Sequence, residues 1–372
     1  MSVENIAARW TRARKLAADL GFDALLVTEK FNYWYFTGQL SKEFDKKMRP
    51  MLFLLPVNGA PTAIVYRQTE KALKRSSGIE QVLTYEDIPF PVELISEAIK
   101  SSGLSSARIG AEFGEYDRLG LGYSQLADAM KAFPAARFDD GSPVFEELRT
   151  IKMPDEIALI REACAMTLRA WDKAVGRFEF GMTNKDVKRT LAVALTEEGS
   201  DFDIAGHVTI GNGIHGETPY KEGESIWADF GGTYRGYQAD IARRAIFGEP
   251  SAEALGYQEQ ISEILAAEIA AIRPGVRASD VARAVSSEMT ARGHKPLGPK
   301  KRVGHGVGLS QAEAPSLGLA DDTILRPGMV LTPEPRFDLP SGERIHIEEV
   351  VVVTETGCEQ LTTGAFDLAV VR

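Results

Sequence analysis

Residues 225–248 read SIWADFGGTYRGYQADIARRAIFG, and this stretch indicates the fold more strongly than any other part of the chain. Two runs rich in apolar residues flank the glycine-bounded segment GGTYRG, a pattern typical of a β-hairpin. Asp229 and Asp240 lie symmetrically about Tyr234 and Arg235. A turn centred there would place the two aspartates opposite each other, with Cβ atoms about 5 Å apart. Because two anions so close together repel each other, the pair predicts a cation between them.

A second predicted hairpin carries another pair of carboxylates. Residues 329–354 read MVLTPEPRFDLPSGERIHIEEVVVVT, with Glu334 and Glu348 almost symmetric about the Pro-Ser-Gly turn and strongly β-forming runs beyond them. The second pair is therefore expected to face across its hairpin as the first does. Between the two hairpins, residues 304–309 read GHGVGL, where the flanking glycines let the backbone approach closely and present His305.

These four carboxylates and one imidazole predict a metal site. They balance two divalent cations in formal charge, and a mixed oxygen and nitrogen set suits Mn, Fe, Co or Zn better than thiol-selected metals. Two such ions can polarise a carbonyl and lower the pKa of a bridging water to near neutral, so hydrolysis is the expected chemistry. Taken singly, each residue has a simpler explanation as a turn, solvated strand or loop residue. The order and spacing of the five together favour the metal site.

The length of 372 residues predicts about two domains, each with its own core. With 44% hydrophobic and 26% charged residues, the composition is that of an ordinary folded protein. The segment ELRTIKMPDEIALIREAC, residues 147–164, places Pro154 in the first turn of a long helix, with acidic residues at the positive end of that helix. We place the boundary at this segment and expect domains at residues 1–150 and 151–372.

The N-terminal domain is predicted to be α/β, because helical and strand patterns alternate along it. Its expected helices span residues 4–20, 68–76, 91–102 and 121–132, and its expected strands span residues 23–28, 51–55 and 63–66. The C-terminal domain is predicted to be α+β. Its expected helices span residues 155–178, 184–198, 251–272 and 278–292, and its expected strands span residues 205–211, 224–230, 237–247, 329–335 and 345–354.

Charge and cysteine content restrict the partners and the compartment. A net charge of -10 argues against binding to nucleic acid or to anionic membranes. The first 22 residues alternate apolar and charged positions, unlike a signal peptide, and no run in the chain approaches the roughly 18 apolar residues of a membrane span. Cys164 and Cys358 are too few and too distant for a disulfide framework, so we expect a cytoplasmic protein.

The order Asp-x10-Asp, GHGxG, TxEP and IEExVVVT resembles the family that contains prolidase, aminopeptidase P, methionine aminopeptidase and creatinase, which share the pita-bread fold. Residues 12–38, of the pattern RxRKLAxxLGFDALLVTxxxNYWYFTG, and residues 148–164, of the pattern LRxIKMPDEIALIREAC, also resemble the N-terminal domain and linker helix of the prolidase and creatinase branch. The resemblance covers nearly the whole chain. Methionine aminopeptidases generally lack the extra domain, so the prolidase-like branch is the better match.

The resemblance implies an α/β creatinase-like N-terminal domain and an α+β pita-bread catalytic domain. It also implies that two divalent ions of Mn, Co, Zn or Fe bind to the five positions that match the ligands of the family. These positions are Asp229, Asp240, His305, Glu334 and Glu348. The implied activity is that of a dinuclear metallohydrolase of the Xaa-Pro dipeptidase or aminopeptidase type, which cleaves short peptides by attack of a metal-bridging hydroxide.

The sequence departs from the peptidase pattern of the family at three points. The pattern GHGxGxxxHExP reads GHGVGLSQAEAP at residues 304–315, so Ala312 replaces the histidine that usually contacts the scissile amide, whereas Glu313 is kept. The arginine usually found two residues before the last metal glutamate is His346. The Pro-His pair usually found upstream of the first aspartate reads Pro-Tyr at residues 219–220.

Three further residues are candidates for the reaction. His215, in the segment GNGIHGETP, has a context similar to that of the catalytic histidine of creatinase, which implies substrate binding or proton transfer, with an ordinary loop histidine as the alternative. Glu313, together with Glu334, is expected near the proton path. His346 points to the same side of its strand as Glu348, which fits orientation of that ligand or contact with the substrate as well as simple packing.

Other histidines and a group of aromatic residues are interpreted structurally. His207 lies in an apolar β run and is predicted to be structural, and His294 lies in a Gly-Lys-Pro loop and is predicted to be exposed. Five aromatic residues between positions 31 and 36 are expected in the core of the N-terminal domain. The resemblance offers an alternative, in which this loop reaches the active site of the partner subunit in a homodimer.

Three functions stay open on the sequence alone. A peptidase acting on short peptides is the first. The second is a small-molecule hydrolase or lyase of the same fold, similar to ectoine hydrolase or creatinase, that acts on a nitrogenous metabolite; Ala312 favours it. True creatinases lack the metal set, so the five retained positions argue against that particular chemistry. The third is a catalytically silent binding protein, and the same five positions count against it.

Overall fold

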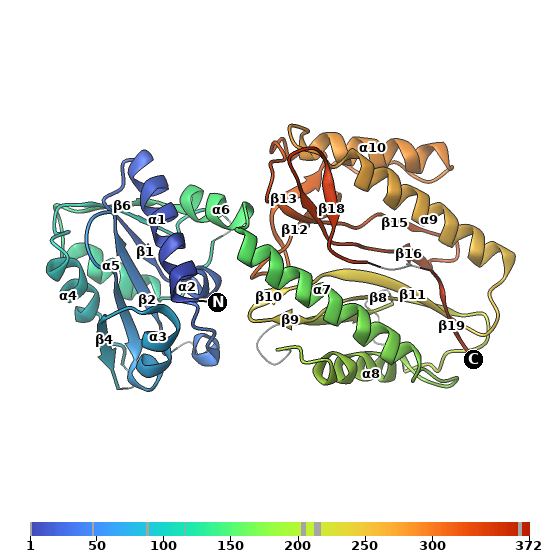
Figure 1. Cartoon of the computed structure of the whole chain (residues 1–372), viewed down its shortest axis with the longest axis horizontal. Helices are drawn as coiled ribbons and strands as arrows, with labels where there is room; N and C mark the ends of the chain where they lie inside the picture. The colour runs from blue at the N-terminus through green and yellow to red at the C-terminus, as the bar shows by residue number, and fades with distance from the viewer. Residues whose placement is uncertain are drawn as a thin grey trace. The chain divides into compact units, whose positions relative to one another are not determined.

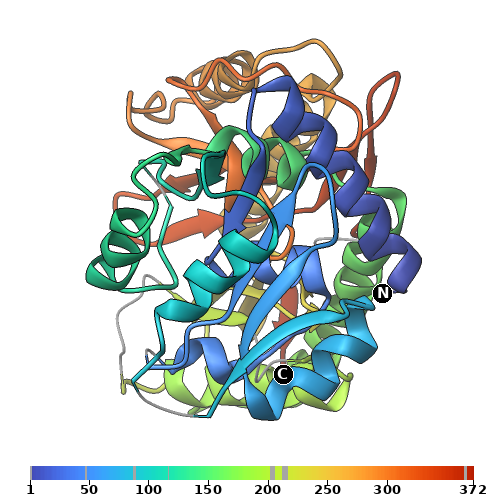
Figure 2. The same ribbon diagram turned by 90° about the vertical axis from the view of Figure 1, so that its left-hand side faces the viewer.

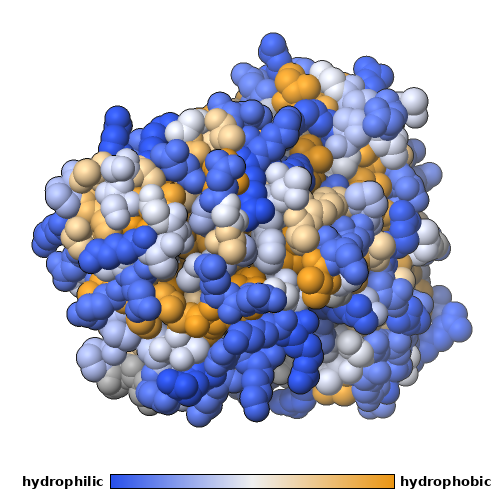
Figure 3. Space-filling view, turned by 60° about the vertical axis from the view of Figure 1, so that its left-hand side comes forward, coloured by the Kyte–Doolittle hydropathy of each residue, from blue (hydrophilic) through white to orange (hydrophobic). Residues whose placement is uncertain are grey.

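The computed structural model describes residues 2–46, 48–86, 89–115, 117–201, 206–211, 217–363 and 367–372. The chain divides into two compact units, Met1–Arg149 and Thr150–Arg372 (Figure 1). No helix in the described ranges is both long and apolar enough to cross a membrane. Hydrophilic residues predominate on the face drawn in Figure 3, with hydrophobic residues in smaller patches between them.

The N-terminal unit is built on a single mixed sheet with the strand order β4-β3-β2-β1-β5-β6. Strand β2 is antiparallel to both of its neighbours, whereas the remaining pairs are parallel. The strands are β1 (Ala24–Val27), β2 (Leu52–Pro56), β3 (Thr62–Tyr66), β4 (Gln81–Tyr85), β5 (Arg108–Ala111) and β6 (Arg137–Asp140). The helices are α1 (Val3–Asp19), α2 (Lys30–Thr37), η1 (Lys42–Asp45), η2 (Arg67–Thr69), α3 (Glu70–Ser77), α4 (Glu93–Ser101), α5 (Tyr123–Lys131) and α6 (Ser142–Thr150).

Helices cover both faces of this sheet, which explains why strands β1, β2 and β3 are buried along their whole length (Figure 2). Leu26, Leu54 and Ile64 belong to one core with the buried residues of α4 and α5. On the opposite face, Trp10 of α1 stacks on Phe53 with ring centroids 6.0 Å apart. The predicted α/β character of this domain is therefore confirmed.

Helix α2 carries the aromatic residues whose place was left open by the sequence. Residues 33–36 have at most 1% of their surface exposed, whereas Phe31 is half-buried. The helix begins at Glu29, whose carboxylate accepts hydrogen bonds from the backbone N–H groups of Phe31 and Asn32. The prediction that the aromatic residues belong to the core is confirmed for residues 33–36.

The long helix predicted after the domain boundary is α7 (Pro154–Val175), with proline at its first position. Glu156 accepts a hydrogen bond from the backbone N–H of Met153 at 2.9 Å. The second oxygen of the same carboxylate accepts one from the hydroxyl of Tyr237 at 2.8 Å. One buried glutamate therefore both caps α7 and ties it to the hairpin that follows the first candidate aspartate.

The C-terminal unit contains two main sheets, with strand orders β19-β11-β8-β7 and β13-β12-β14-β17-β18. Helices α7 and α8 pack against the first sheet, and α9 and α10 against the second (Figure 1). The helices beyond α7 are α8 (Asn184–Glu197), α9 (Ala252–Ala271) and α10 (Ala278–Ala291). The strands are β7 (His207–Ile210), β8 (Ser225–Gly231), β9 (Thr233–Tyr234), β10 (Tyr237–Gln238), β11 (Ile241–Phe247), β12 (Arg302–Gly306), β13 (Glu313–Gly318), β14 (Val330–Pro333), β15 (Arg336–Asp338), β16 (Arg344–His346), β17 (Val351–Val353), β18 (Cys358–Gln360) and β19 (Ala369–Val371).

The predicted helices and strands of this unit are present, but two predicted strands are interrupted. The strand expected at residues 237–247 is divided into β10 and β11, and the strand expected at residues 345–354 is divided into β16 and β17. Asp240 lies in the first interruption and Glu348 in the second. An antiparallel bridge between Ala242 and Glu348 joins the two main sheets at this point. Local breaks in a β ladder redirect side chains, so both carboxylates leave the regular strand pattern where the sheets meet.

The register of the first hairpin differs from the prediction. Its turn is centred on Arg235 and Gly236, whose φ values of 48° and 87° are the left-handed values that a type I′ turn requires at both central positions. Asp229 therefore pairs with Ala242 and not with Asp240. The predicted register is wrong by two residues, so the aspartates are diagonal neighbours. Their carboxylates still come together, because both lie within 3.1 Å of Nε2 of His207.

The second hairpin has the predicted register. Val330 pairs with Val352 in β14 and β17, and Arg336 pairs with His346 in β15 and β16. Both pairings belong to one continuous register, which places Glu334 opposite Glu348. The turn beyond β15 closes with a hydrogen bond from the N–H of Gly342 to a backbone carbonyl.

Candidate metal centre

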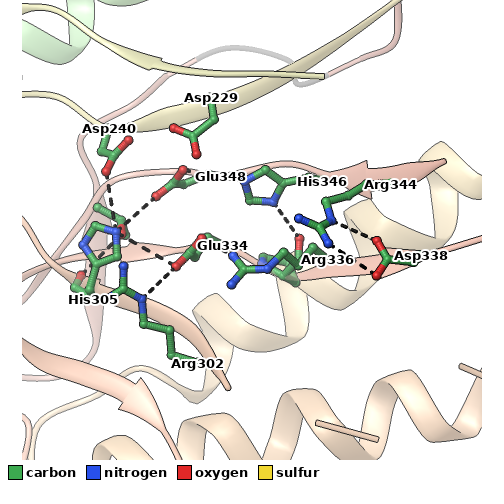
Figure 4. Close-up of polar contacts among 12 residues, drawn as sticks. Asp229, Asp240, Arg302, His305, Glu334, Arg336, Asp338, Arg344, His346 and Glu348 are labelled. Atoms are coloured by element: carbon green, nitrogen blue, oxygen red, sulfur yellow. Dashed lines mark hydrogen bonds and ion pairs between the residues drawn. The ribbon is translucent and has the colours of Figure 1, made fainter. Parts of the chain in front are cut away.

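The five residues predicted as metal ligands converge between the two sheets of the C-terminal unit (Figure 4). Each comes from a different strand or from the end of one, and all four carboxylates point toward the region beside the imidazole. The residues are Asp229 on β8, Asp240 before β11, His305 on β12, Glu334 after β14 and Glu348 before β17. The tertiary fold thus assembles a cluster from positions that span 120 residues of sequence.

His305 lies at the centre of the measured contacts. Its Nε2 atom is 3.5 Å from Oδ2 of Asp240 and 4.0 Å from Oε1 of both Glu334 and Glu348. Its Nδ1 atom is 2.9 Å from the carbonyl oxygen of Gly306. Because a carbonyl only accepts hydrogen bonds, Nδ1 carries the proton and the lone pair of Nε2 faces the carboxylates. This is the orientation that a metal-binding histidine needs.

The carboxylates of the cluster are buried and incompletely paired. Asp240 and Glu348 are each 1% exposed and Glu334 is 5% exposed. Within the described ranges, both oxygens of Asp240 and Oε1 of both Glu334 and Glu348 lack a hydrogen bond of normal geometry. Burial, followed by the neighbouring carboxylates, raises the pKa of Glu348 well above its usual value.

This combination fits a cation better than it fits a set of structural acids. A buried ionised carboxylate is costly unless it is paired or coordinates a metal. Oxygen atoms without a hydrogen bond are also the atoms that remain available as ligands. The donor set of carboxylates with imidazole suits Mn, Fe, Co or Zn, as the sequence predicts.

His207 contacts two of the candidate ligands. Its Nε2 atom lies 3.1 Å from Oδ1 of Asp229 and 2.7 Å from Oδ1 of Asp240. Burial lowers the pKa of His207, but the carboxylates of Asp240 and Asp229 outweigh that effect and raise the pKa to about 10. His207 lies on a strand as predicted, and its side chain contacts two candidate ligands, which the sequence did not indicate. Thr209 pairs with Asp229 across β7 and β8, so His207, two residues earlier, shares the face of the cluster.

His346 borders the cluster from the side of Asp229 and Glu348, with which it forms one group of possible ligand atoms. Its Nδ1 atom is 3.3 Å from the carbonyl oxygen of Pro335, its Nε2 atom is 4.0 Å from Oε2 of Glu348, and its ring lies edge-on to Trp227. Burial lowers the pKa of His346 despite the opposing effect of the carboxylates. The prediction that it points to the side of Glu348 is confirmed.

Arginine side chains neutralise part of the charge of Glu334. Arg336 donates to Oε2 of Glu334, and Nε of Arg302 lies 3.4 Å from Oε1. Arg344, which stands two residues before His346, instead pairs with the exposed Asp338 at 2.9 Å (Figure 4). The arginine nearest to the ligands therefore comes from β15.

Glu313 is occupied by contacts with a neighbouring loop and with a distant lysine. Its Oε2 atom lies 3.1 Å from Nζ of Lys152, and both side chains are almost fully buried. Its Oε1 atom accepts a hydrogen bond from the backbone N–H of Ser310 at 2.9 Å. Because Glu313 pairs with Gly306 across β12 and β13, these contacts hold the loop that follows His305.

The two remaining histidines considered in the sequence are His215 and His294. His215 lies outside the described residues. His294, predicted to be exposed, is half-buried: its ring stacks on Phe337 with centroids 3.7 Å apart, and its Nε2 atom lies 2.9 Å from Oε1 of Gln260. That prediction is wrong because α9 and β15 approach the loop from parts of the chain that are distant in sequence.

Residues 158–355 match metallopeptidase family M24, and residues 9–151 match the creatinase/prolidase N-terminal domain. The probable dipeptidase PepE of Mycobacterium tuberculosis is 30% identical over 380 residues, which cover 99% of this chain and 97% of the relative. The crystal structure of dipeptidase PepE from Mycobacterium ulcerans has a TM-score of 0.83 and 25% identity, covering 100% of this chain and 99% of that one. The X-Pro aminopeptidase from Thermotoga maritima also has a TM-score of 0.83 and 25% identity, covering 97% and 99%. The chain therefore belongs to metallopeptidase family M24, with the pita-bread fold and a creatinase/prolidase N-terminal domain.

Proposed function

We propose that this protein is a metal-dependent peptidase that hydrolyses short peptides. The observation that carries the proposal is the group of buried carboxylate oxygens that lack hydrogen bonds in the described ranges and converge beside Nε2 of His305. Two divalent cations would be held by Asp229, Asp240, His305, Glu334 and Glu348. The family and the names of its dipeptidase and aminopeptidase members support this assignment.

The bound cations would polarise the scissile carbonyl and make an attacking water acidic enough to react near neutral pH. Glu334 is the carboxylate that we assign to proton transfer, because its Oε1 atom lacks a hydrogen bond in the described ranges while Arg336 holds Oε2 in place. Glu313 is assigned a positioning role, because Lys152 and the backbone of Ser310 hold its carboxylate. It would act by fixing the loop that carries His305.

Histidines supply the polar contacts that a peptide substrate needs. The contact of Nδ1 of His346 with the Pro335 carbonyl leaves the Nε2 lone pair on the side of the cluster. We assign His346 to hydrogen bonding with a substrate N–H or to orientation of Glu348. His215 remains a proposed residue for substrate binding or proton transfer, and Ala312 supplies no such contact of its own.

Xaa-Pro dipeptides are the substrates that we propose first, since solved relatives include an X-Pro aminopeptidase. Ala312 favours a second candidate, a small nitrogenous metabolite that is hydrolysed or cleaved at the same centre. Homodimerisation and a cytoplasmic location also remain proposals. The burial of residues 33–36 leaves Phe31 as the aromatic residue of α2 with the most surface for contact with a partner subunit.

Elemental analysis combined with turnover tests this proposal. The purified full-length protein is incubated with Mn, Co, Zn or Fe, dialysed, and assayed for metal content and for release of proline from Xaa-Pro dipeptides. About two metals per chain with proline release is the expected result. Bound metal without hydrolysis of any short peptide would indicate that the substrate is a small nitrogenous metabolite. Failure to bind metal after reconstitution would overturn the metal-dependent function.

A matched pair of variants shows whether the measured metal belongs to this cluster. Glu348→Gln removes a buried ligand, whereas Asp338→Asn changes an exposed carboxylate of the same hairpin. We expect metal loss only in Glu348→Gln. Equal metal contents in the two variants would place the metal elsewhere.

A further inference from the structure

We propose that His207 is a sixth protein ligand of the metal centre and binds, through Nε2, the cation held by Asp229 and Asp240. This inference rests on the proposed metal-dependent function and extends it by one residue. His207, Asp229 and Asp240 form one of the groups of side chains whose ligand atoms lie within 4.8 Å of one another. The sequence pattern gives this histidine no place in the set of five ligands.

The distances around Nε2 of His207 are short enough for its neighbours to share one cation with it. Ligand atoms about 2.0 to 2.2 Å from a shared metal lie roughly 3 Å from one another. Nε2 of His207 lies 2.7 Å from one oxygen of Asp240 and 3.1 Å from one oxygen of Asp229. The same atom of His305 is 3.5 to 4.0 Å from its carboxylate neighbours. Of these two histidines, His207 therefore has the closer contact with the carboxylates.

Two carboxylates converge on one nitrogen atom of His207. The contact with Asp229 has hydrogen-bond geometry, whereas both oxygens of Asp240 lack a hydrogen bond of normal geometry in the described ranges. Nε2 carries at most one N–H, yet it lies within 3.1 Å of oxygens from both aspartates. Nε2 of His207 and the nearest oxygens of Asp229 and Asp240 therefore converge as the donor atoms of one cation would.

The backbone fixes His207 at this position. Strand β7 pairs with β8 in a regular antiparallel register that places Thr209 opposite Asp229 and His207 opposite Gly231. Gly231 has no side chain, and a Cβ atom there would lie 1.7 Å from the carbonyl oxygen of Ala239 and 2.9 Å from Cε1 of His207. The glycine therefore leaves room for the imidazole ring beside the aspartates.

This assignment gives the two metal positions a histidine each. His305 would serve the cation near Glu334 and Glu348, and His207 would serve the cation near Asp229. Imidazole suits Zn, Fe and Cu, whereas carboxylate and water suit Mn. Loss of His207 should therefore weaken binding of Zn and Co at one site more than binding of Mn.

Cobalt titration of the full-length protein tests the proposal without using activity. The number of Co(II) ions per chain and the Kd of each are measured by calorimetry and by visible absorption for wild type and for His207→Ala. His294→Ala is the control, because that imidazole contacts Gln260 and Phe337. We expect one of the two Kd values to rise more than about 100-fold in His207→Ala, beyond the roughly 10- to 100-fold that supporting partners cost. Circular dichroism verifies that each variant is folded.

His207→Cys separates a ligand from a residue that only orients the aspartates. A thiolate that binds Co(II) directly adds a sulfur-to-cobalt charge-transfer band, and a neighbouring thiol does not. Weaker metal binding in His207→Ala together with that band in His207→Cys would support the proposal. Unchanged Kd values in His207→Ala would overturn it while leaving the proposed function intact. A wild-type protein that binds no cobalt would overturn both.

Discussion

The two units of this protein bury carboxylates in opposite ways. In the N-terminal unit, Glu112 is 1% exposed and accepts hydrogen bonds from the backbone N–H and hydroxyl of Thr28, the backbone N–H of Glu29 and the side-chain amide of Asn32. In the C-terminal unit, Asp240 is equally buried, and neither of its oxygens has a hydrogen bond of normal geometry in the described ranges.

The difference shows how a structural acid can be told from a metal ligand. The hydrogen bonds of Glu112 fix the turn between β1 and α2 and leave its carboxylate little capacity for a ligand. Around Asp240, one oxygen each of Glu334 and Glu348 also lacks a hydrogen bond in the described ranges, and the carboxylates repel each other. The fold therefore holds them together at a cost that bound cations would offset. Burial alone therefore does not distinguish a structural acid from a metal ligand. The distinction lies in whether each carboxylate oxygen already accepts a hydrogen bond.

The largest expected effect is that of Glu348→Gln. Loss of a carboxylate that holds the cations should lower kcat/KM for the reactive substrate by about 100- to 1000-fold or more. The metal-free variant should unfold at a temperature equal to or higher than that of metal-free wild type, because one of several repelling buried charges is gone. Kinetics and thermal unfolding in chelator check both parts. A clear loss of stability in the metal-free variant would show that Glu348 is a structural acid.

Glu112→Ala should have the opposite effect to Glu348→Gln. It should lower the stability of the protein and leave its metal content unchanged. The variant leaves the donors of Thr28, Glu29 and Asn32 buried without an acceptor, which should destabilise the N-terminal unit by about 3 kcal/mol. Denaturant unfolding followed by hydrogen exchange in β1 and β5 measures the effect. Glu112→Gln, which keeps one oxygen acceptor, is the matched control and should lose less. Any change in metal content would show that the two regions are not independent.

Removal of metal should destabilise only the C-terminal unit. At a free metal concentration of 100 times Kd, each site that binds only the folded state contributes about 2.7 kcal/mol. A chelator should therefore increase hydrogen exchange in β8, β11 and β14 and leave that of β1 and β5 unchanged. An equal increase in both units would argue against a metal site confined to the C-terminal one.

The pH should affect the two units with opposite sign. Burial, despite its hydrogen bonds, raises the pKa of Glu112 to about 7 from an ordinary value of 4.5. Because the folded state holds this proton more tightly than the unfolded state, the contribution of Glu112 to stability is complete below pH 4.5. It is lost as the pH rises toward 7, by no more than about 1.4 kcal/mol per pH unit. Glu112→Gln should abolish this dependence in the N-terminal unit. The metal-loaded C-terminal unit should instead lose stability as the pH falls, because protons compete with cations for the carboxylates.

The smallest effect is expected for the exposed pair of Arg344 and Asp338. Their side chains are 36% and 61% exposed, and such pairs contribute well under about 1 kcal/mol. Asp338→Asn should change the unfolding free energy by no more than about 0.5 kcal/mol and leave metal content and turnover unchanged. A larger loss of activity would place this end of the hairpin in the substrate site.

Sequence alone determined the fold class, the five candidate ligands and many of the elements, although strands β4, β5, β6, β12 and β13 were not among those predicted. The signals for these elements are local: apolar periodicity, proline at the start of α7 and glycine-rich turns. They can therefore be recognised without knowledge of the tertiary fold. The ligand set was recognisable because its order and spacing, and not any single residue, resembled those of a known family. The same reasoning placed residues 33–36 in the core, where the structure has them.

Only the tertiary structure decided which other residues meet the cluster. The turn at Arg235 and Gly236 shifted the hairpin register by two residues, and the pairing of β7 with β8 turned His207 toward the aspartates. The ion pair of Lys152 with Glu313 joins residues 161 positions apart, which leave no mark in the local sequence. Strand register and long-range contacts depend on the packing of the whole unit, and a residue's neighbours in sequence do not encode them.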